Sequence, residues 1–214
     1  MRTAGDGYRI DLGDGYHERE GAGRWMPLSR PFSGTGEEFF GDVGADRLRY
    51  PVSPKPTSLL FDYKVKLSGD PNRIKLSGFS KRSEVNGIDM PLVNLFLQKR
   101  WEDKDGNIYA KRIGTLVIRM DENTDWVNDA SFTILYGDIT KRSDYKEYMG
   151  FQLGESARYS LNSKGKNVPV QEIGWGTEDD EVTHMILEFC SSHGGSYIGS
   201  PGNTFWVDNI RLGY

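Results

Sequence analysis

Aromatic residues in turn-rich stretches are the side chains that point most clearly to a chemistry. Trp101 and Tyr109 flank the predicted tip of a long hairpin, Trp175 lies between two glycines, and Tyr197 follows a Gly-Gly-Ser run. A sugar ring has a face of C–H groups that stacks on a flat aromatic ring, and a rim of hydroxyls that binds polar side chains. These four aromatics therefore predict a carbohydrate-binding site, although each could instead pin a hairpin or fill a core.

Polar partners for a sugar are predicted on the same hairpin. Gln98 and Arg112 lie close to the two aromatic residues of its tip, and Lys99 lies beside them. They supply an amide, a guanidinium and an ammonium group, which bind hydroxyls well. We expect Gln98 and Arg112 to contact a sugar that stacks on the rings.

Catalytic templates are weak in this chain. Its three histidines, His17, His184 and His193, lack the His-Glu-x-x-His spacing, and there is no Gly-x-Ser-x-Gly elbow. A glycosidase needs two carboxylates about 5.5 Å apart for retention, or about 6.5–9.5 Å apart for inversion. The chain has 31 Asp and Glu residues, and nothing in the sequence selects a pair. Binding is therefore favoured over catalysis.

Asp208 stands out in the closing stretch of the chain. With a period of two, Asp208 shares one face of a strand with Trp206, Ile210 and Leu212. A carboxylate buried on an apolar face is unfavourable without a partner, so a cation, an arginine or backbone N–H groups should compensate it. Trp206 and Trp126 are predicted to lie in the core.

The composition fits one β-rich domain. The chain has 214 residues, of which 26 are glycine and 12% are aromatic, which favours strands and turns. The net charge of −4 gives no electrostatic reason to expect nucleic acid. No apolar run approaches the roughly 20 residues of a membrane span. Cys190 is the only cysteine, and we expect it in the core.

Alternating apolar segments predict an all-β sandwich of two antiparallel sheets, with no helix. The clearest strands are 58–67, 92–101, 108–120, 182–191 and 199–212. Residues 138–180 are mostly polar and are predicted to be loop around a short apolar segment. We expect a single domain over 1–214, with a loop-rich N-terminal segment, 1–46.

Two blocks of the chain resemble the "Putative carbohydrate metabolism domain" family, which consists of secreted β-sandwich proteins of Gram-negative gut bacteria. One block covers 181–192 and 194–212 and ends in Phe205-Trp-Val-Asp-Asn-Ile-Arg-Leu212; the other, within 49–65, contains Pro56-Thr-Ser-Leu-Leu-Phe-Asp-Tyr-Lys64. The ending is also similar to that of jelly-roll carbohydrate-binding modules. The resemblance implies a jelly-roll fold and an extracellular, cell-surface or periplasmic location, with the export signal removed from this chain.

The same resemblance implies a structural calcium ion. In similar jelly-roll modules the acid of the closing Val-Asp motif binds calcium, and Asp208 matches that acid. Asp11, Asp14 and Glu18 are the expected partners, because the other ligands come from the N-terminal segment. The alternative is that a salt bridge or backbone N–H groups satisfy Asp208.

The sequence leaves three functions open. The first is a carbohydrate-binding domain for polysaccharide capture or use at the bacterial cell surface or in the periplasm. Its partners would be a polysaccharide or oligosaccharide and other domains or surface proteins of a glycan-uptake system. The second is a glycoside hydrolase or polysaccharide lyase. The third is a non-catalytic structural or adhesion domain that binds protein.

Overall fold

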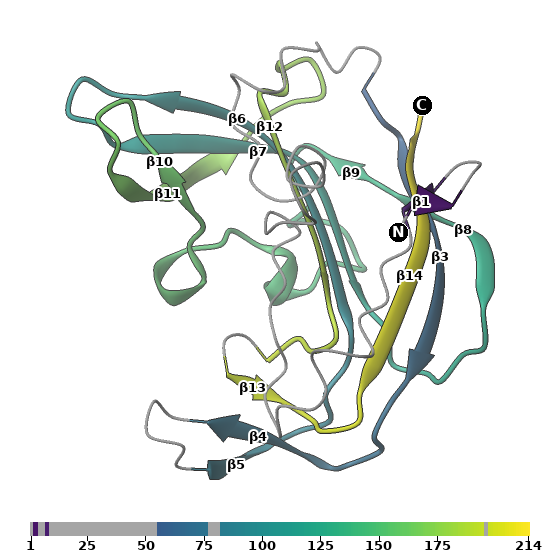
Figure 1. The fold of residues 1–214 in the computed structure, drawn as a ribbon. Helices are drawn as coiled ribbons and strands as arrows, with labels where there is room; N and C mark the ends of the chain where they lie inside the picture. The colour runs from purple at the N-terminus through teal and green to yellow at the C-terminus, as the bar shows by residue number, and fades with distance from the viewer. Residues whose placement is uncertain (1, 4–6, 9–54, 77–81, 195–196) are drawn as a thin grey trace.

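The computed structural model describes residues 2–3, 7–8, 55–76, 82–194 and 197–214. These residues form strands and two short 3-10 helices, and they contain no α-helix. The elements, labelled in Figure 1 where there is room, are β1 (Arg2–Thr3), β2 (Gly7–Tyr8), β3 (Ser58–Lys66), β4 (Asn72–Leu76), β5 (Arg82–Asn86), β6 (Leu92–Glu102), β7 (Ile108–Arg119), β8 (Val127–Thr133), β9 (Leu135–Tyr136), η1 (Glu147–Met149), η2 (Gly154–Ser156), β10 (Tyr159–Leu161), β11 (Asn167–Trp175), β12 (His184–Cys190), β13 (Ile198–Gly199) and β14 (Thr204–Gly213).

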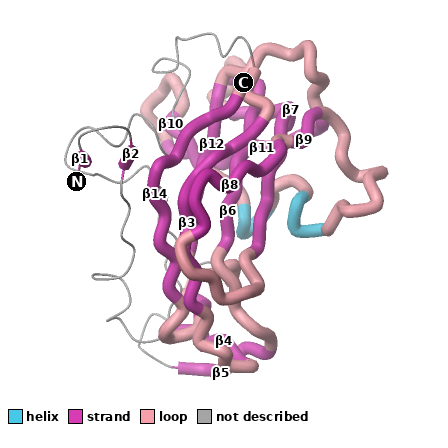
Figure 2. Tube along the Cα trace, turned by 90° about the vertical axis from the view of Figure 1, so that its right-hand side faces the viewer, coloured by secondary structure: helices cyan, strands magenta, loops and turns pink. Residues whose placement is uncertain are grey.

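Two sheets pack against each other and form a β-sandwich (Figure 1). The larger sheet has the strand order β10-β11-β7-β6-β12, and β9 also pairs with β7. The smaller sheet has the order β14-β3-β8 and lies in front of the larger one in Figure 2. The predicted all-β sandwich is therefore confirmed. The observed sandwich differs from the prediction of two antiparallel sheets in one detail, because β11 runs parallel to β7 and makes the larger sheet mixed.

Apolar side chains from alternate strand positions fill the space between the two sheets. On the smaller sheet, Phe61 and Phe205 are fully buried. On the larger sheet, the core residues are Val93, Leu95, Leu97, Ile113, Leu116, Leu187 and Phe189. The rings of Phe61 and Phe189 meet across the gap with centroids 5.1 Å apart and planes at 83°. Such edge-to-face contacts fix how the two sheets sit on one another.

The larger sheet extends beyond the sandwich. At the lower end of Figure 1, β4, β5 and β13 form a separate three-stranded sheet. At the upper left, the hairpin of β6 and β7 continues past the smaller sheet, with β10 and β11 beside it. We call this extension the arm; it consists of residues 98–112 and 159–175. Its strands are continuous with the core, so the sandwich positions it.

The closing strand places Asp208 differently from the prediction. Val207 is fully buried, so Asp208 and Trp206 lie on the opposite, outer face of the smaller sheet. The register then shifts after Asp208, where Asn209 has a φ of 52°, and this bulge turns Leu212 back towards the core. The predicted apolar face around Asp208 and the core position of Trp206 are therefore wrong.

Other sequence predictions had mixed outcomes. Cys190 is buried, as expected, whereas Trp126 is 39% exposed and does not lie in the core. The stretch 138–180, predicted to be mostly loop, contains β10 and β11. Nearly all of segment 1–46 lies outside the described residues. In the part of the chain that the structure describes, no helix has the length and hydropathy needed to cross a membrane.

Candidate functional site

The arm carries a stacked aromatic pair on one face. Trp101 of β6 lies directly opposite Tyr109 of β7. Their ring centroids are 6.0 Å apart and their planes are 26° from parallel. Trp101 is 40% exposed and Tyr109 is half-buried. A cross-strand aromatic pair stabilises a hairpin by about 0.2–1 kcal/mol, and this pair also leaves ring surface open to solvent.

The strands β11 and β10 extend this face sideways. Gln171 is the register partner of Tyr109, and Tyr159 pairs with Pro169, two residues before Gln171. Since side chains alternate along a strand, Gln171, Tyr159 and Leu161 lie on the same face as Tyr109. Tyr159 is 55% exposed and Leu161 is 71% exposed. We call this surface the aromatic platform; it consists of Trp101, Tyr109, Tyr159, Leu161 and Gln171.

The tips of the two hairpins of the arm are tied together. Ser163, in the β10–β11 turn, donates from its backbone N and its Oγ to the Glu102 carboxylate, at 2.8 and 2.6 Å. The side chain of Asn162 donates to the carbonyl of Gly106 at 2.8 Å. These bonds join turns that are far apart in the sequence. They hold the platform in shape before a ligand arrives, which lowers the ordering cost of binding.

The β6–β7 turn is stabilised from within by Asp103. Its carboxylate accepts the backbone N–H groups of Asp105 and Asn107 and the Asn107 side chain, each at 2.9 Å. The hydrogen bonds from Asn107 lower the pKa of Asp103 below its usual value. Gly106 follows with a φ of +91°, which glycine adopts without strain.

A second row of side chains adds charge beside the platform. Lys99 and Lys111 are register partners on the same face, two residues from the ring pair towards the core. Lys99 donates to Asp180 at 3.0 Å, and Lys111 is exposed. The backbone N–H of Thr177 and then the Lys99 ammonium lower the pKa of Asp180 to about 2. Asp180 therefore stays charged at neutral pH, and Lys111 offers an ammonium group at the platform's edge.

The predicted partners Gln98 and Arg112 lie on the opposite face of the arm. Gln98 is 2% exposed and Arg112 is fully buried. Glu172 accepts hydrogen bonds from Gln98 Nε2 at 2.6 Å, from the Arg112 guanidinium on both carboxylate oxygens, and from the Gln152 N–H at 2.7 Å. Gln98 and Arg112 therefore cannot contact a ligand on the platform. The predicted grouping fails because residues three apart on a strand point to opposite faces.

The face of the arm opposite the platform carries a cluster of buried charged side chains that are paired with one another. Burial lowers the pKa of Arg112, and the Glu172 carboxylate opposes that shift. The guanidinium also lies 3.7 Å from the centre of the Phe96 ring. Further along the same face, Glu188 accepts hydrogen bonds from Arg158 at 2.6 Å and Asn94 at 3.1 Å. We call this group the buried charge cluster; it consists of Asn94, Gln98, Arg112, Arg158, Glu172 and Glu188.

The two carboxylates of the buried charge cluster, Glu172 and Glu188, are both engaged in ion pairs. Both side chains are at most 4% exposed, and each is bound by an arginine. The carboxylates of a glycosidase flank a bond of the substrate, whereas these two are buried against their arginines. The cluster thus supports the fold of the arm.

The remaining predicted aromatics lie away from the platform. Trp175 is the register partner of Arg112, and its ring packs on Phe151 with centroids 4.7 Å apart. Tyr197 precedes β13 at the other end of the sandwich, where its carbonyl accepts the Leu76 N–H at 2.9 Å. Tyr197 is 68% exposed. Of the four predicted aromatics, the structure therefore brings together only the hairpin pair.

Three platform residues were absent from the sequence prediction. Tyr159, Leu161 and Gln171 lie on β10 and β11, within the stretch 138–180 that the sequence predicts to be mostly loop. The signal that could have found them is the turn Asn162-Ser-Lys-Gly-Lys-Asn167, because a Gly-containing loop between two short alternating runs is typical of a hairpin. Gly165 in that turn has a φ of +70°.

Asp208 was the predicted centre of a calcium site. It lies opposite Asp62 on the smaller sheet, and its Oδ1 accepts the Asn209 N–H at 2.8 Å. Both oxygens of Asp62 accept hydrogen bonds, from the Asp129 N–H at 2.6 Å and the Asn209 side chain at 2.5 Å. Among the described residues, no three His, Cys, Asp or Glu side chains gather as a metal site. Three predicted ligands lie outside the described residues: Asp11, Asp14 and Glu18.

No protein-family model and no curated protein matches the chain. Among solved structures, the chain is similar to a crystal structure of a "putative glycoside hydrolase" from Bacteroides vulgatus ATCC 8482. The identity is 14% and the TM-score is 0.35, over 74% of this chain and 52% of the other. The chain thus spans about half the length of that protein. A likeness at this level transfers no activity to this chain.

Proposed function

We propose that this chain is a non-catalytic carbohydrate-binding domain whose aromatic platform binds a polysaccharide. The exposed Trp101–Tyr109 stack, on the same face as Tyr159 and Gln171, is the observation that carries the proposal. The rings offer flat surface to the C–H faces of sugars. The Gln171 amide, the tyrosine hydroxyls and the Lys111 ammonium supply donors and acceptors for the hydroxyl groups.

The shape of the platform favours an extended chain of sugars. Its rings lie on β6, β7 and β10, with β11 between the last two. Neighbouring strands are about 4.8 Å apart, so the three rings span about 14 Å across the sheet. One sugar ring would cover only part of that surface. We therefore expect the platform to bind adjacent units of a polymer.

A catalytic role has less support. The five platform residues carry no carboxylate, and Glu172 and Glu188 are held by arginines on the buried face. Asp180, beside the platform, is engaged by Lys99 and the Thr177 N–H. A general acid must instead be free to protonate the leaving group. Binding without bond cleavage fits this arrangement better than hydrolysis or elimination.

The proposal extends to the setting of the protein. We infer an exported protein that captures glycans at the cell surface or in the periplasm, together with other domains or surface proteins of a glycan-uptake system. The resemblance of the blocks that end in Leu212 and Lys64 to secreted β-sandwich proteins supports this setting. A structural calcium ion at Asp208 belongs to the same proposal, and a melting temperature that falls with chelator would support it.

A matched pair of tryptophan variants tests the platform. Trp101→Ala should weaken binding by about tenfold to a polysaccharide that the wild-type chain binds, because it removes the most exposed ring of the stack. Trp126→Ala is the control, since Trp126 is 39% exposed against 40% for Trp101 but lies next to β8 on the other sheet. Binding is measured by affinity electrophoresis across a panel of soluble polysaccharides, and folding by thermal melts.

The outcomes of this test separate the three functions. Equal binding by wild type, Trp101→Ala and Tyr159→Ala would remove the platform from the site. Release of shorter products from any glycan would indicate a hydrolase or lyase. The absence of binding to every polysaccharide would contradict the proposal and shift the search to protein ligands, for which exposed Leu161 and Ile173 provide apolar surface.

A further inference from the structure

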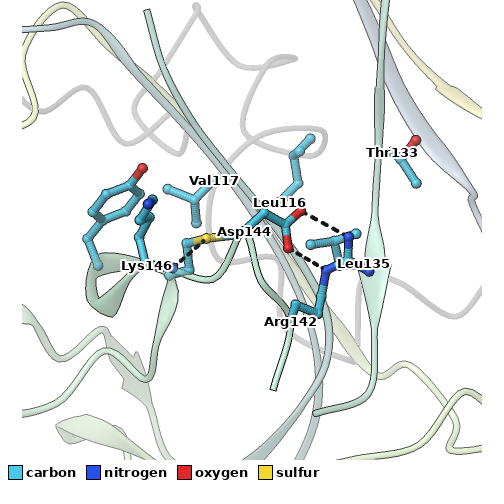
Figure 3. Close-up of a pocket in the computed structure, with 9 residues that line it drawn as sticks. Leu116, Val117, Thr133, Leu135, Arg142, Asp144 and Lys146 are labelled. Atoms are coloured by element: carbon cyan, nitrogen blue, oxygen red, sulfur yellow. Dashed lines mark hydrogen bonds and ion pairs between the residues drawn. The ribbon is translucent and has the colours of Figure 1, made fainter. Parts of the chain in front are cut away.

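A pocket is lined in part by residues of β7 and β9, and Figure 3 shows the side chains around it. Its volume is about 530 Å³, within the range of about 300–1,000 Å³ that is usual for small-ligand sites. The apolar part of its lining comes from Leu116 and Val117 of β7 and Leu135 of β9. The other side comes from residues 142–149, the segment that leads into and includes η1, so two parts of the chain line this open pocket.

Charged side chains of that segment line the pocket. Arg142 binds Asp144 through two hydrogen bonds, from Nε at 2.8 Å and Nη2 at 2.9 Å, and both are drawn in Figure 3. This pairing lowers the pKa of Asp144 and leaves Arg142 Nη1 outside the pair. Lys146 is exposed and lines the pocket, and its positive charge also lowers the pKa of Asp144. Two cations against one anion give the pocket a positive potential.

An aromatic ring completes the lining. Tyr148 is 39% exposed and lines the pocket. The guanidinium of Arg119 lies 3.7 Å from the centre of this ring, so it supports the ring and adds a third positive charge close to the pocket. An aromatic surface, an apolar floor and paired charges are the features that hold a sugar ring.

We propose that this pocket is a second ligand site, which binds a sugar residue that carries an anionic group. The group is the carboxylate of a uronic acid or a sulfate ester. Lys146 and Arg142 Nη1 bind the anion, as ammonium and guanidinium groups bind carboxylate or sulfate. Tyr148 contacts the ring of the sugar, and Asp144 accepts a hydrogen bond from one of its hydroxyls.

The pocket and the platform are separate sites. Val117 and Tyr109 lie on the same strand, eight residues apart, which corresponds to about 26 Å. One sugar unit therefore cannot occupy both. The two sites also differ in chemistry, because the platform needs no charge on its ligand, whereas the pocket requires a negative one.

Calorimetric titration of the full chain tests the pocket with three short ligands of similar size. These are an oligogalacturonate, a sulfated galactose oligosaccharide and a neutral galactose oligosaccharide. We expect an acidic ligand to bind at least about tenfold more tightly than the neutral one. Its affinity should fall when salt is raised from 50 to 500 mM, because ions screen exposed charges. The first two ligands show which anion the pocket prefers.

Substitutions then test whether the acidic ligand binds in the pocket. Lys146→Ala and Arg142→Gln should each weaken the preferred acidic ligand about tenfold. Lys141→Ala removes the same charge from an exposed neighbour that does not line the pocket, and it should leave the affinity unchanged. All three variants should keep the wild-type melting temperature within a few degrees, because the substituted side chains are exposed.

Two results would overturn this assignment. One is that neither acidic ligand binds the wild-type chain. The other is that Lys141→Ala and Lys146→Ala weaken binding equally, since that would indicate a general charge effect. Failure of the pocket is distinguishable from failure of the platform, because the pocket variants should bind a neutral polysaccharide as tightly as the wild type, whereas Trp101→Ala should bind it more weakly.

Discussion

The two faces of the arm are made of alternate residues of the same strands, and they have opposite environments. On one face, Trp101 and Tyr109 present their rings to solvent. On the other, Gln98, Arg112 and Glu172 are buried under the segment that contains Gln152 and Phe151. The buried face sets the geometry of the strands, and the exposed face uses that geometry for binding. A rigid sheet can thus present a flat site without a pocket.

The largest expected effect comes from breaking the buried face. Glu172→Gln leaves the Arg112 charge buried and without its carboxylate, and removing one partner of a buried pair costs about 3–5 kcal/mol. The free energy of unfolding, measured in urea, should fall by that amount. The variant that still folds should bind polysaccharide like the wild type, because no platform side chain has changed. A loss below about 1 kcal/mol would mean that the ion pair does not support the arm.

A double variant sharpens the result. Replacing both partners, Arg112→Met with Glu172→Leu, removes both charges and fills a similar volume. Such replacements of a buried ion pair are often neutral or stabilising. We expect the double variant to be clearly more stable than Glu172→Gln. If it is equally unstable, the cost lies in lost packing or in the bonds from Gln98 and Gln152.

A smaller effect is expected at the junction of the two hairpin tips. A Cβ at position 106 would lie 2.6 Å from the Asn162 Nδ2, and Gly106 has a φ of +91°. Gly106→Ala should cost about 1–3 kcal/mol from the backbone alone, and displacing Asn162 breaks its bond to the 106 carbonyl. Polysaccharide binding should weaken as well, because that bond helps to hold the two hairpins of the platform together.

A second glycine provides the control for this substitution. Gly165 also has a positive φ, of +70°, but a Cβ there meets nothing within 4 Å. Gly165→Ala therefore carries the backbone strain without the contact. The unfolding free energies should differ by about 1 kcal/mol, the value of one hydrogen bond. Equal losses in the two variants would show that the bond between the tips contributes nothing.

The strands of the core could be predicted because the pattern of apolar residues along each strand follows its burial. Ser58–Lys66 alternates, and Leu92–Glu102 begins with a nearly continuous apolar run. That run reflects a sheet covered on both faces, by the smaller sheet and by the segment before β10. By contrast, Asn167–Trp175 contains Pro169 and a buried Glu172, and its parallel pairing with β7 depends on distant residues. Local pattern does not reveal such pairing.

The candidate site was half predictable. The ring pair followed from the hairpin, because Trp101 and Tyr109 are cross-strand partners at its tip. The polar partners predicted for the ring pair were wrong because side chains alternate along a strand. Gln98 lies three residues from Trp101 and therefore points to the opposite face. The prediction that Asp208 lies on an apolar face was wrong for a different reason. The bulge at Asn209 resets the alternation, and nothing in the residue types marks where a bulge falls.

The smallest expected effect concerns the ion pair beside the platform. The pKa of Asp180 is depressed to about 2 from 3.8. A depressed pKa adds stability above the unfolded value, and this stability is lost as pH falls through the folded value. Asp180→Asn should therefore lower the melting temperature at pH 7, and its difference from wild type should shrink between about pH 4 and pH 2.

The neighbouring acid gives the comparison for this pair. Asp179→Asn removes the same charge from an exposed side chain and should change the melting temperature less at pH 7. Because Lys99 and Asp180 are 42% and 21% exposed, solvent screens their interaction, and the loss in Asp180→Asn should be far below that in Glu172→Gln. If Asp180→Asn and Glu172→Gln lost equal stability, burial would not explain the difference between the two faces of the arm. The exposed face would then stabilise the arm as much as the buried face does.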